Sequence, residues 1–80
     1  MNERLKYMGQ RSELDLEKKS LEIKIKGLVA NLRDALDPMA QIGDLHTAEI
    51  LEWSLELTDA RDRYSETVSK LNQIRDILGR

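Results

Sequence analysis

The chain contains no cysteine and no phenylalanine, and its only aromatic residues are Tyr7, Trp53 and Tyr64. Without thiols, neither a disulfide framework nor a thiolate metal site can form. Because strands are enriched in aromatic and β-branched residues, the shortage of aromatics argues against a sheet. Leu, Glu, Lys, Arg, Asp and Ala dominate instead, which is typical of long helices and coiled coils. The composition therefore predicts an all-α fold.

Long apolar runs are also missing, since no stretch approaches the roughly 20 residues that span a bilayer. The first residues, Met1 to Lys6, lack the apolar core of a signal peptide, so a cytoplasmic location is expected. The formal net charge of −2 provides no general attraction for nucleic acid or for anionic membranes. We expect no membrane partner.

Proline and glycine are scarce, and the one concentrated break lies between Asp37 and Asp44. Pro38 cannot continue a preceding helix, and Asp37 before it suits the cap of a single turn. Gly43 is expected in the left-handed conformation that ends such a turn, with Asp44 capping a second helix. The prediction is one domain over residues 1–80, with a helix over about 3–36, a connection over 37–43 and a second helix over about 44–78.

The start of the first helix leaves an alternative open. Gly9 is a poor helix residue, and Ser12 with Asp15 three positions later resembles a capping box. Residues 1–11 therefore form either the first turns of this helix or a separate turn.

Apolar residues recur with alternating three- and four-residue spacing in both predicted helices, which indicates a coiled-coil-like pairing. In the first predicted helix, Lys18 is the one polar residue among these apolar positions, and the methylenes of its side chain can line the seam. Trp53 is expected within about one turn of Ile25 and Leu28. The rows are Leu14, Lys18, Leu21, Ile25, Leu28, Leu32 and Ala35, and Ile50, Trp53, Leu57, Ala60, Tyr64, Thr67, Leu71, Ile74 and Leu78.

Charge favours an antiparallel hairpin. Between Lys18 and Arg33 the first helix carries five basic residues and a single acidic one, Glu22. Between Asp44 and Glu66 the second helix carries seven acidic residues and two basic ones. Folding back about the connection is expected to bring the basic stretch alongside the acidic stretch, although each exposed pair contributes only ~0.5 kcal/mol.

Further apolar residues fall outside these rows and concentrate near the connection. Scattered exposed apolar groups need no explanation, but contiguous ones mark association. A homodimer forming a four-helix bundle is the simplest way to cover them, and a helix of another protein is the alternative. The candidate association surface consists of Leu16, Ile23, Val29, Leu36, Leu45, Ala48, Leu51 and Leu55.

Catalysis is not expected, and no cofactor, metal or small-molecule substrate is implied. His46 is the only histidine, and no second histidine or cysteine is available to complete a transition-metal site. Acid–base chemistry requires a concave pocket that separates the pKa values of its carboxyl groups, and straight paired helices provide none. Glycine-rich phosphate loops are absent as well.

The first predicted helix carries a row of basic residues along one face. Lys19, Lys26 and Arg33 are seven residues apart and share one helix face. Such a row either contacts phosphates, as in helical nucleic-acid-binding proteins, or is a solvated face that balances the acidic helix. No aromatic residue interleaves it to stack on bases, so the solvated face is favoured.

The stretch Leu32-Arg33-Asp34-Ala35-Leu36-Asp37-Pro38, with Ile42, Tyr64, Leu71, Ile74 and Leu78 after it, resembles short helical-hairpin proteins of Mu-like bacteriophages and prophages. The resemblance covers most of residues 12–79 and consists of a leucine-rich helix, an Asp-Pro turn and a second heptad helix. It implies a bacterial cytoplasmic setting, an accessory role in a phage, and contacts with proteins or with packaged DNA. It implies no activity and no site residues.

Overall fold

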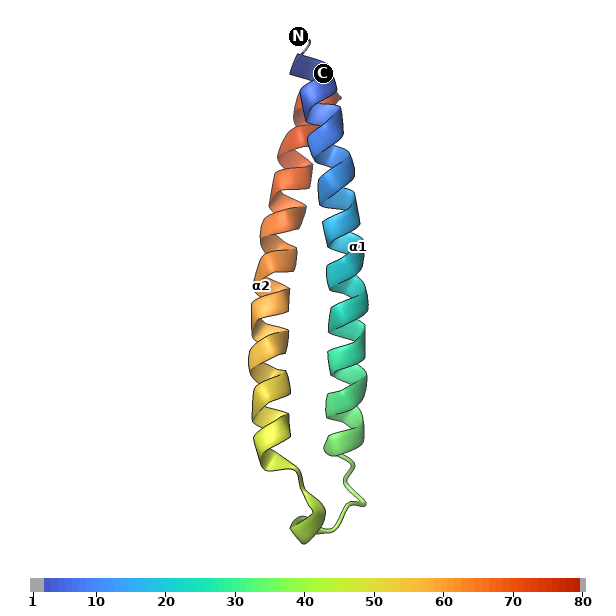
Figure 1. Ribbon diagram of the computed structural model, residues 1–80, viewed down its shortest axis with the longest axis vertical. Coiled ribbons are helices and arrows are strands. Elements are labelled where there is room, and N and C mark those ends of the chain that lie inside the picture. Colours follow the sequence, from blue (N-terminus) through green and yellow to red (C-terminus); the bar gives the residue numbers. More distant parts are fainter. Residues whose placement is uncertain (1–2, 80) are drawn as a thin grey trace.

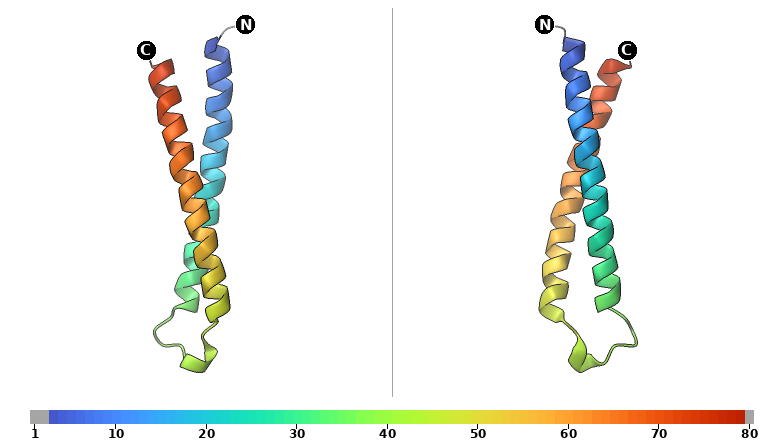
Figure 2. Two further views of the ribbon diagram at one scale, coloured as in Figure 1. Left: turned by 90° about the vertical axis from the view of Figure 1, so that its left-hand side faces the viewer. Right: turned by 45° about the vertical axis from the view of Figure 1, so that its right-hand side comes forward.

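The computed structural model describes residues 3–79 and is an antiparallel helical hairpin (Figure 1). Helix α1 spans Glu3–Ala35, a short 3₁₀ turn η1 spans Ile42–Asp44, and helix α2 spans Thr47–Leu78. The helices wind past one another, and both chain ends lie opposite the connection (Figure 2). The predicted all-α hairpin is confirmed.

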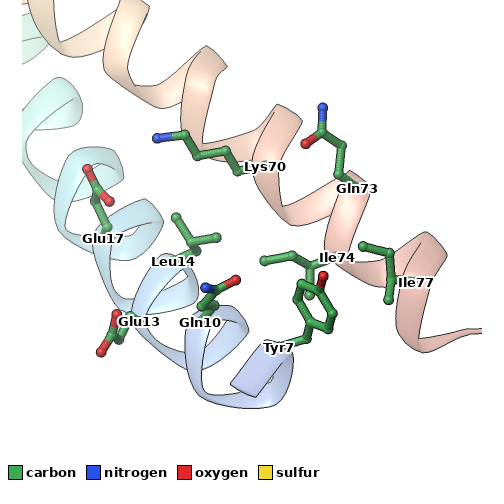
Figure 3. Close-up of a pocket in the computed structure, with 9 residues that line it drawn as sticks. All are labelled: Tyr7, Gln10, Glu13, Leu14, Glu17, Lys70, Gln73, Ile74 and Ile77. Atoms are coloured by element: carbon green, nitrogen blue, oxygen red, sulfur yellow. The ribbon is translucent and has the colours of Figure 1, made fainter. Parts of the chain in front are cut away.

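Helix α1 runs without interruption through Gly9 and Ser12. The alternative of a separate N-terminal turn is therefore wrong for residues 3–11, and residues 1–2 lie outside the described part. Tyr7 explains the continuity, because it lines a hollow together with Ile74 and Ile77 of α2 (Figure 3). Packing against α2 supports the first turns of a long helix more than intrinsic propensity does.

The seam between the helices follows the predicted heptad rows, whose residues are all buried or half-buried. Lys18 is half-buried, as expected for a lysine that lays its methylenes along apolar neighbours. Thr67 is a buried polar side chain of the seam. Its hydroxyl donates a hydrogen bond to the Arg63 carbonyl at 2.8 Å. The most buried apolar residues are Leu21, Leu28, Ala60, Leu71 and Ile74.

Two hydrogen bonds between the helices set their register. Tyr64 donates to the Glu22 carboxylate at 3.3 Å, and the Arg4 guanidinium donates to the Leu78 carbonyl at 3.4 Å. Carried along the hairpin, this register places residues 29–33 opposite Trp53. Leu28 is thus within about one turn of that level, as predicted, and Ile25 lies about one to two turns from it.

The connection is longer than predicted, because α2 begins at Thr47 and not at Asp44. The Asp37 carboxylate accepts the backbone N–H of Met39 at 2.9 Å, which confirms a turn at Asp-Pro. Asp44 belongs to η1, and the N-cap residue of α2 is His46, without a side-chain cap hydrogen bond. No described glycine has a positive φ, so the left-handed Gly43 is also wrong.

Gly43 therefore should tolerate alanine. An added Cβ meets nothing within 4 Å, and the backbone is already in a region that alanine adopts. We expect Gly43→Ala to leave the free energy of unfolding unchanged or raise it by up to about 1 kcal/mol, since alanine restricts the unfolded chain. Chemical denaturation followed by circular dichroism measures this. A clear loss of stability would show that Gly43 needs the conformational freedom of glycine.

The hairpin is a rod with extents of 62 × 17 × 15 Å and an accessible surface of 6500 Å². A compact monomer of 9.3 kDa would expose only about 5,000 Å². Two helices have one seam between them, and every other helix face remains open to solvent. The shape thus leaves much more surface available for contacts than a globular domain of this length.

Candidate association surface

All eight residues of the candidate association surface are exposed. The largest exposed fractions in this set belong to two side chains in the middle of α1 and two near the start of α2: Leu16 at 68%, Ile23 at 74%, Leu51 at 62% and Leu55 at 64%. These values are high for leucine and isoleucine, which are usually buried.

Leu16 and Ile23 of α1 point away from α2. Leu16 lies two residues after Leu14 and two before Lys18, both in the seam, and two residues turn a helix by about 200°. Ile23 and Ala30 follow at seven-residue steps and share its direction. We call Leu16, Ile23 and Ala30, with their exposed neighbours, the α1 outer face.

The same geometry holds for α2. Leu55 lies midway between the seam residues Trp53 and Leu57, so it points away from α1. Ala48 precedes Leu55 by seven residues, and Leu51 lies one turn before it. We call Ala48, Leu51 and Leu55, with their exposed neighbours, the α2 outer face. The two outer faces are on opposite sides of the rod.

The remaining candidates lie elsewhere. Val29 and Leu36 flank the seam and line an open hollow of about 730 Å³ with Leu57 near the connection. Leu45 lies in the connection, just before α2. The predicted surface is therefore not one patch: it divides between two opposed outer faces, one side of the seam and the connection. Periodicity identified the exposed residues correctly, but it did not separate their directions.

The basic and acidic stretches lie side by side, as predicted, because the register places residues 18–33 of α1 opposite about residues 49–68 of α2. The three ion pairs between described residues each join side chains of the same helix: Arg11–Asp15, Asp59–Arg63 and Arg61–Asp62. Among the described residues, no ion pair joins the two stretches across the seam. Outside these stretches, Glu17 of α1 and Lys70 of α2 line the same hollow beside the seam (Figure 3).

The long charged rows lie on the outer faces. Lys19, Lys26 and Arg33 are all exposed and lie one turn after the residues that define the α1 outer face. On α2, an exposed acidic row with the same seven-residue spacing runs beside Ala48 and Leu55, and consists of Glu52, Asp59 and Glu66. One outer face is thus apolar and basic, and the other is apolar and acidic.

The hollow in Figure 3 has a volume of about 410 Å³ and lies near the free ends of the helices. Its apolar lining comes from Tyr7, Leu14, Ile74 and Ile77, which extend the seam. Within residues 3–79, no three His, Cys, Asp or Glu side chains gather closely enough to hold a metal ion. His46 is exposed at the start of α2.

Several exposed apolar residues were not included in the candidate surface. Met39 and Ile42 in the connection are each 87% exposed. Helical spacing does not identify them, because they lie outside both helices. Leu5 lies two seven-residue steps before Lys19, in line with the basic row rather than with the apolar row, so spacing alone did not select it. The other two are Met8 and Ile77.

Comparison of the chain with protein-family models, with curated proteins and with solved structures found no match. Across the described residues, neither helix has a segment apolar enough and long enough to cross a membrane.

Proposed function

We propose that this protein is a non-enzymatic interaction module of the cytoplasm that works by packing its exposed helix faces against other helices, first of all those of its own copies. The observation that carries the proposal is the pair of outer faces, each with long apolar side chains that are more than 60% exposed. Contiguous exposed apolar residues mark association surfaces. The large surface of the rod adds to the apolar area that association removes from water.

A homodimer that forms a four-helix bundle was the form expected from the sequence. The two outer faces point in opposite directions. One neighbouring hairpin can therefore cover only one of the two faces. Self-association through both faces requires contacts on two sides of the rod. A helix from another protein remains the alternative occupant of either face.

Sedimentation equilibrium tests the proposal directly. We expect the purified protein at micromolar concentration to show a mass of at least twice that of the chain. Burial of apolar surface at the outer faces provides the driving force. A mass equal to one chain up to hundreds of micromolar would contradict self-association.

The resemblance to hairpin proteins of Mu-like phages supports an accessory role in a phage or prophage, as part of this proposal. In that setting the partner is another protein or packaged DNA. Nucleic-acid binding is the second candidate, and the exposed row of Lys19, Lys26 and Arg33 is the observation that favours it. These side chains project about 10 Å apart along α1.

The second candidate predicts a steep dependence on salt. About three phosphate contacts per chain, doubled in a dimer, give a log–log slope of roughly −5 on duplex DNA. We expect no such binding at physiological salt, because the aromatic residues lie in the seam and the net charge is −2. Changing Lys19, Lys26 and Arg33 together to Gln should also preserve the helical circular dichroism spectrum. A sub-micromolar complex that the triple variant loses would instead establish nucleic-acid binding.

A further inference from the structure

We infer that the α1 outer face of one copy packs against the α2 outer face of a second copy, with these two helices running parallel. The inference rests on the proposed self-association and deepens it by naming which faces meet. Its basis is that a single register matches Leu16 and Ile23 with apolar residues of α2, and the basic row with the acidic row, at the same time. In this register Ala30 comes level with the exposed Asp62.

The apolar residues match first. Parallel helices rise equally per residue, so one alignment fixes all others. With Ile23 level with Leu55 of the second copy, Leu16 is level with its Ala48, and a large side chain meets a small one. Leu51 then falls between the levels of Leu16 and Ile23. This alternation of large and small side chains lets two helices approach and interdigitate.

The charged rows match in the same register. Lys19 comes beside Glu52, Lys26 beside Asp59, and Arg33 beside Glu66 of the second copy, as flanking residues do in parallel coiled coils. All six side chains are exposed. Asp59 is engaged within its own chain by Arg63 at 3.3 Å, and with its side chain 60% exposed it remains open to a second cation.

On the other flank of this contact, the residues near the centre carry no charge on either helix. There Ser20 and Gly27 of α1 come beside Leu51 and Thr58 of the second copy, and Gly27 has open space around it. The antiparallel arrangement with both connections at one end fits less well. It brings Asp34 beside Glu52, two like charges, and places the basic row opposite uncharged residues.

A contact of this kind does not end with two copies. The outer faces point in opposite directions, so the second copy presents a free α1 outer face to a third. The contact is heterologous, and association continues into a lateral array in which neighbouring copies alternate in direction. A two-fold dimer would instead use the same face on both copies.

Exchange of the charges tests the inference. One variant carries Lys19→Glu, Lys26→Glu and Arg33→Glu, and the other carries Glu52→Lys, Asp59→Lys and Glu66→Lys. Alone, each variant presents two outer faces of like charge, and its self-association should weaken by roughly tenfold or more. Mixed in equal amounts, the two variants present complementary faces and should recover the wild-type mass in sedimentation equilibrium.

A control variant distinguishes the effect of the acidic row from the effect of a changed net charge. Glu3→Lys, Glu49→Lys and Glu56→Lys change three carboxylates to lysine, as in the second variant, at exposed positions outside both rows and both outer faces. We expect this control to associate like the wild type. Circular dichroism checks that every variant stays helical, and changes of the same rows to Gln replace any variant that does not fold.

The outcomes separate the inference from the proposed function. A wild-type mass that rises beyond two copies, lost in each row variant and restored in the mixture, supports both. A wild type that stops at two copies, a row variant that associates normally, or a mixture that stays monomeric overturns the inference but leaves self-association in place. A monomeric wild type overturns both.

Discussion

Replacing Leu71 by alanine should lower the free energy of unfolding by about 2–4 kcal/mol, because it removes a buried side chain and leaves a cavity in the seam. Leu71 is 2% exposed and is the largest fully buried side chain of the described core. Such a loss is a large share of the stability of a small protein. Urea denaturation followed by circular dichroism measures this loss, at a protein concentration too low for self-association.

Leu51→Ala is the matched control, since it makes the same chemical change on the α2 outer face. Leu51 is 62% exposed, so its truncation should change the stability of the isolated hairpin by less than about 0.5 kcal/mol. Equal losses at the two positions would contradict the assignment of seam and outer face.

The change with the largest expected effect on association places carboxylates in the apolar part of the α2 outer face. With Leu51→Asp and Leu55→Asp, helix packing at this face would have to bury two charges, which costs several kcal/mol. We expect the variant to be monomeric at concentrations where the wild type is associated, with unchanged helix content. Sedimentation equilibrium and circular dichroism provide the two measurements.

The control for this variant adds the same two charges to polar positions on the same side of α2 but beyond the part that α1 of a second copy covers, Ser69→Asp and Asn72→Asp. Both side chains are exposed and contribute little apolar surface. The control should retain most of the association. Loss of association in the control alone would show that charge, and not the apolar part of the face, decides packing.

The helices and their seam were predictable because heptad spacing reports directly on which side of a helix is buried. The rows that contain Leu21 and Leu71 were correct at every position. The charges along each helix correctly placed the basic stretch beside the acidic one, but counting them gives no information on the direction of each side chain. Lys19 and Glu52 belong to the predicted basic and acidic stretches, but both point away from the seam.

The connection was predicted least well. Asp44 can cap a helix or enter a 3₁₀ turn, and the choice depends on the path of the chain between the ends of α1 and α2. In the structure the N–H of Asp44 donates to the Gln41 carbonyl at 2.9 Å, and the chain extends through Leu45 before α2 begins. Local capping preference carries no information on that path.

Division of the candidate surface into two faces also required the structure. Leu16, Leu36 and Leu55 look equivalent as apolar residues outside the heptad rows. The register fixed by Tyr64 and Glu22, together with burial, shows that they point in three different directions. The parallel match between the charged rows becomes visible only after those directions are known.

Cysteine cross-linking tests most directly the claim that the two outer faces meet between copies. The native chain has no cysteine, so Gly27→Cys and Thr58→Cys introduce the only thiols. Both positions are exposed on opposite outer faces, too far apart in direction to be joined within one chain. We expect the double variant to form a ladder of disulfide-linked chains on mild oxidation, whereas neither single variant forms more than traces of dimer. Efficient dimers of Gly27→Cys alone, or a double variant that does not cross-link, would contradict the account.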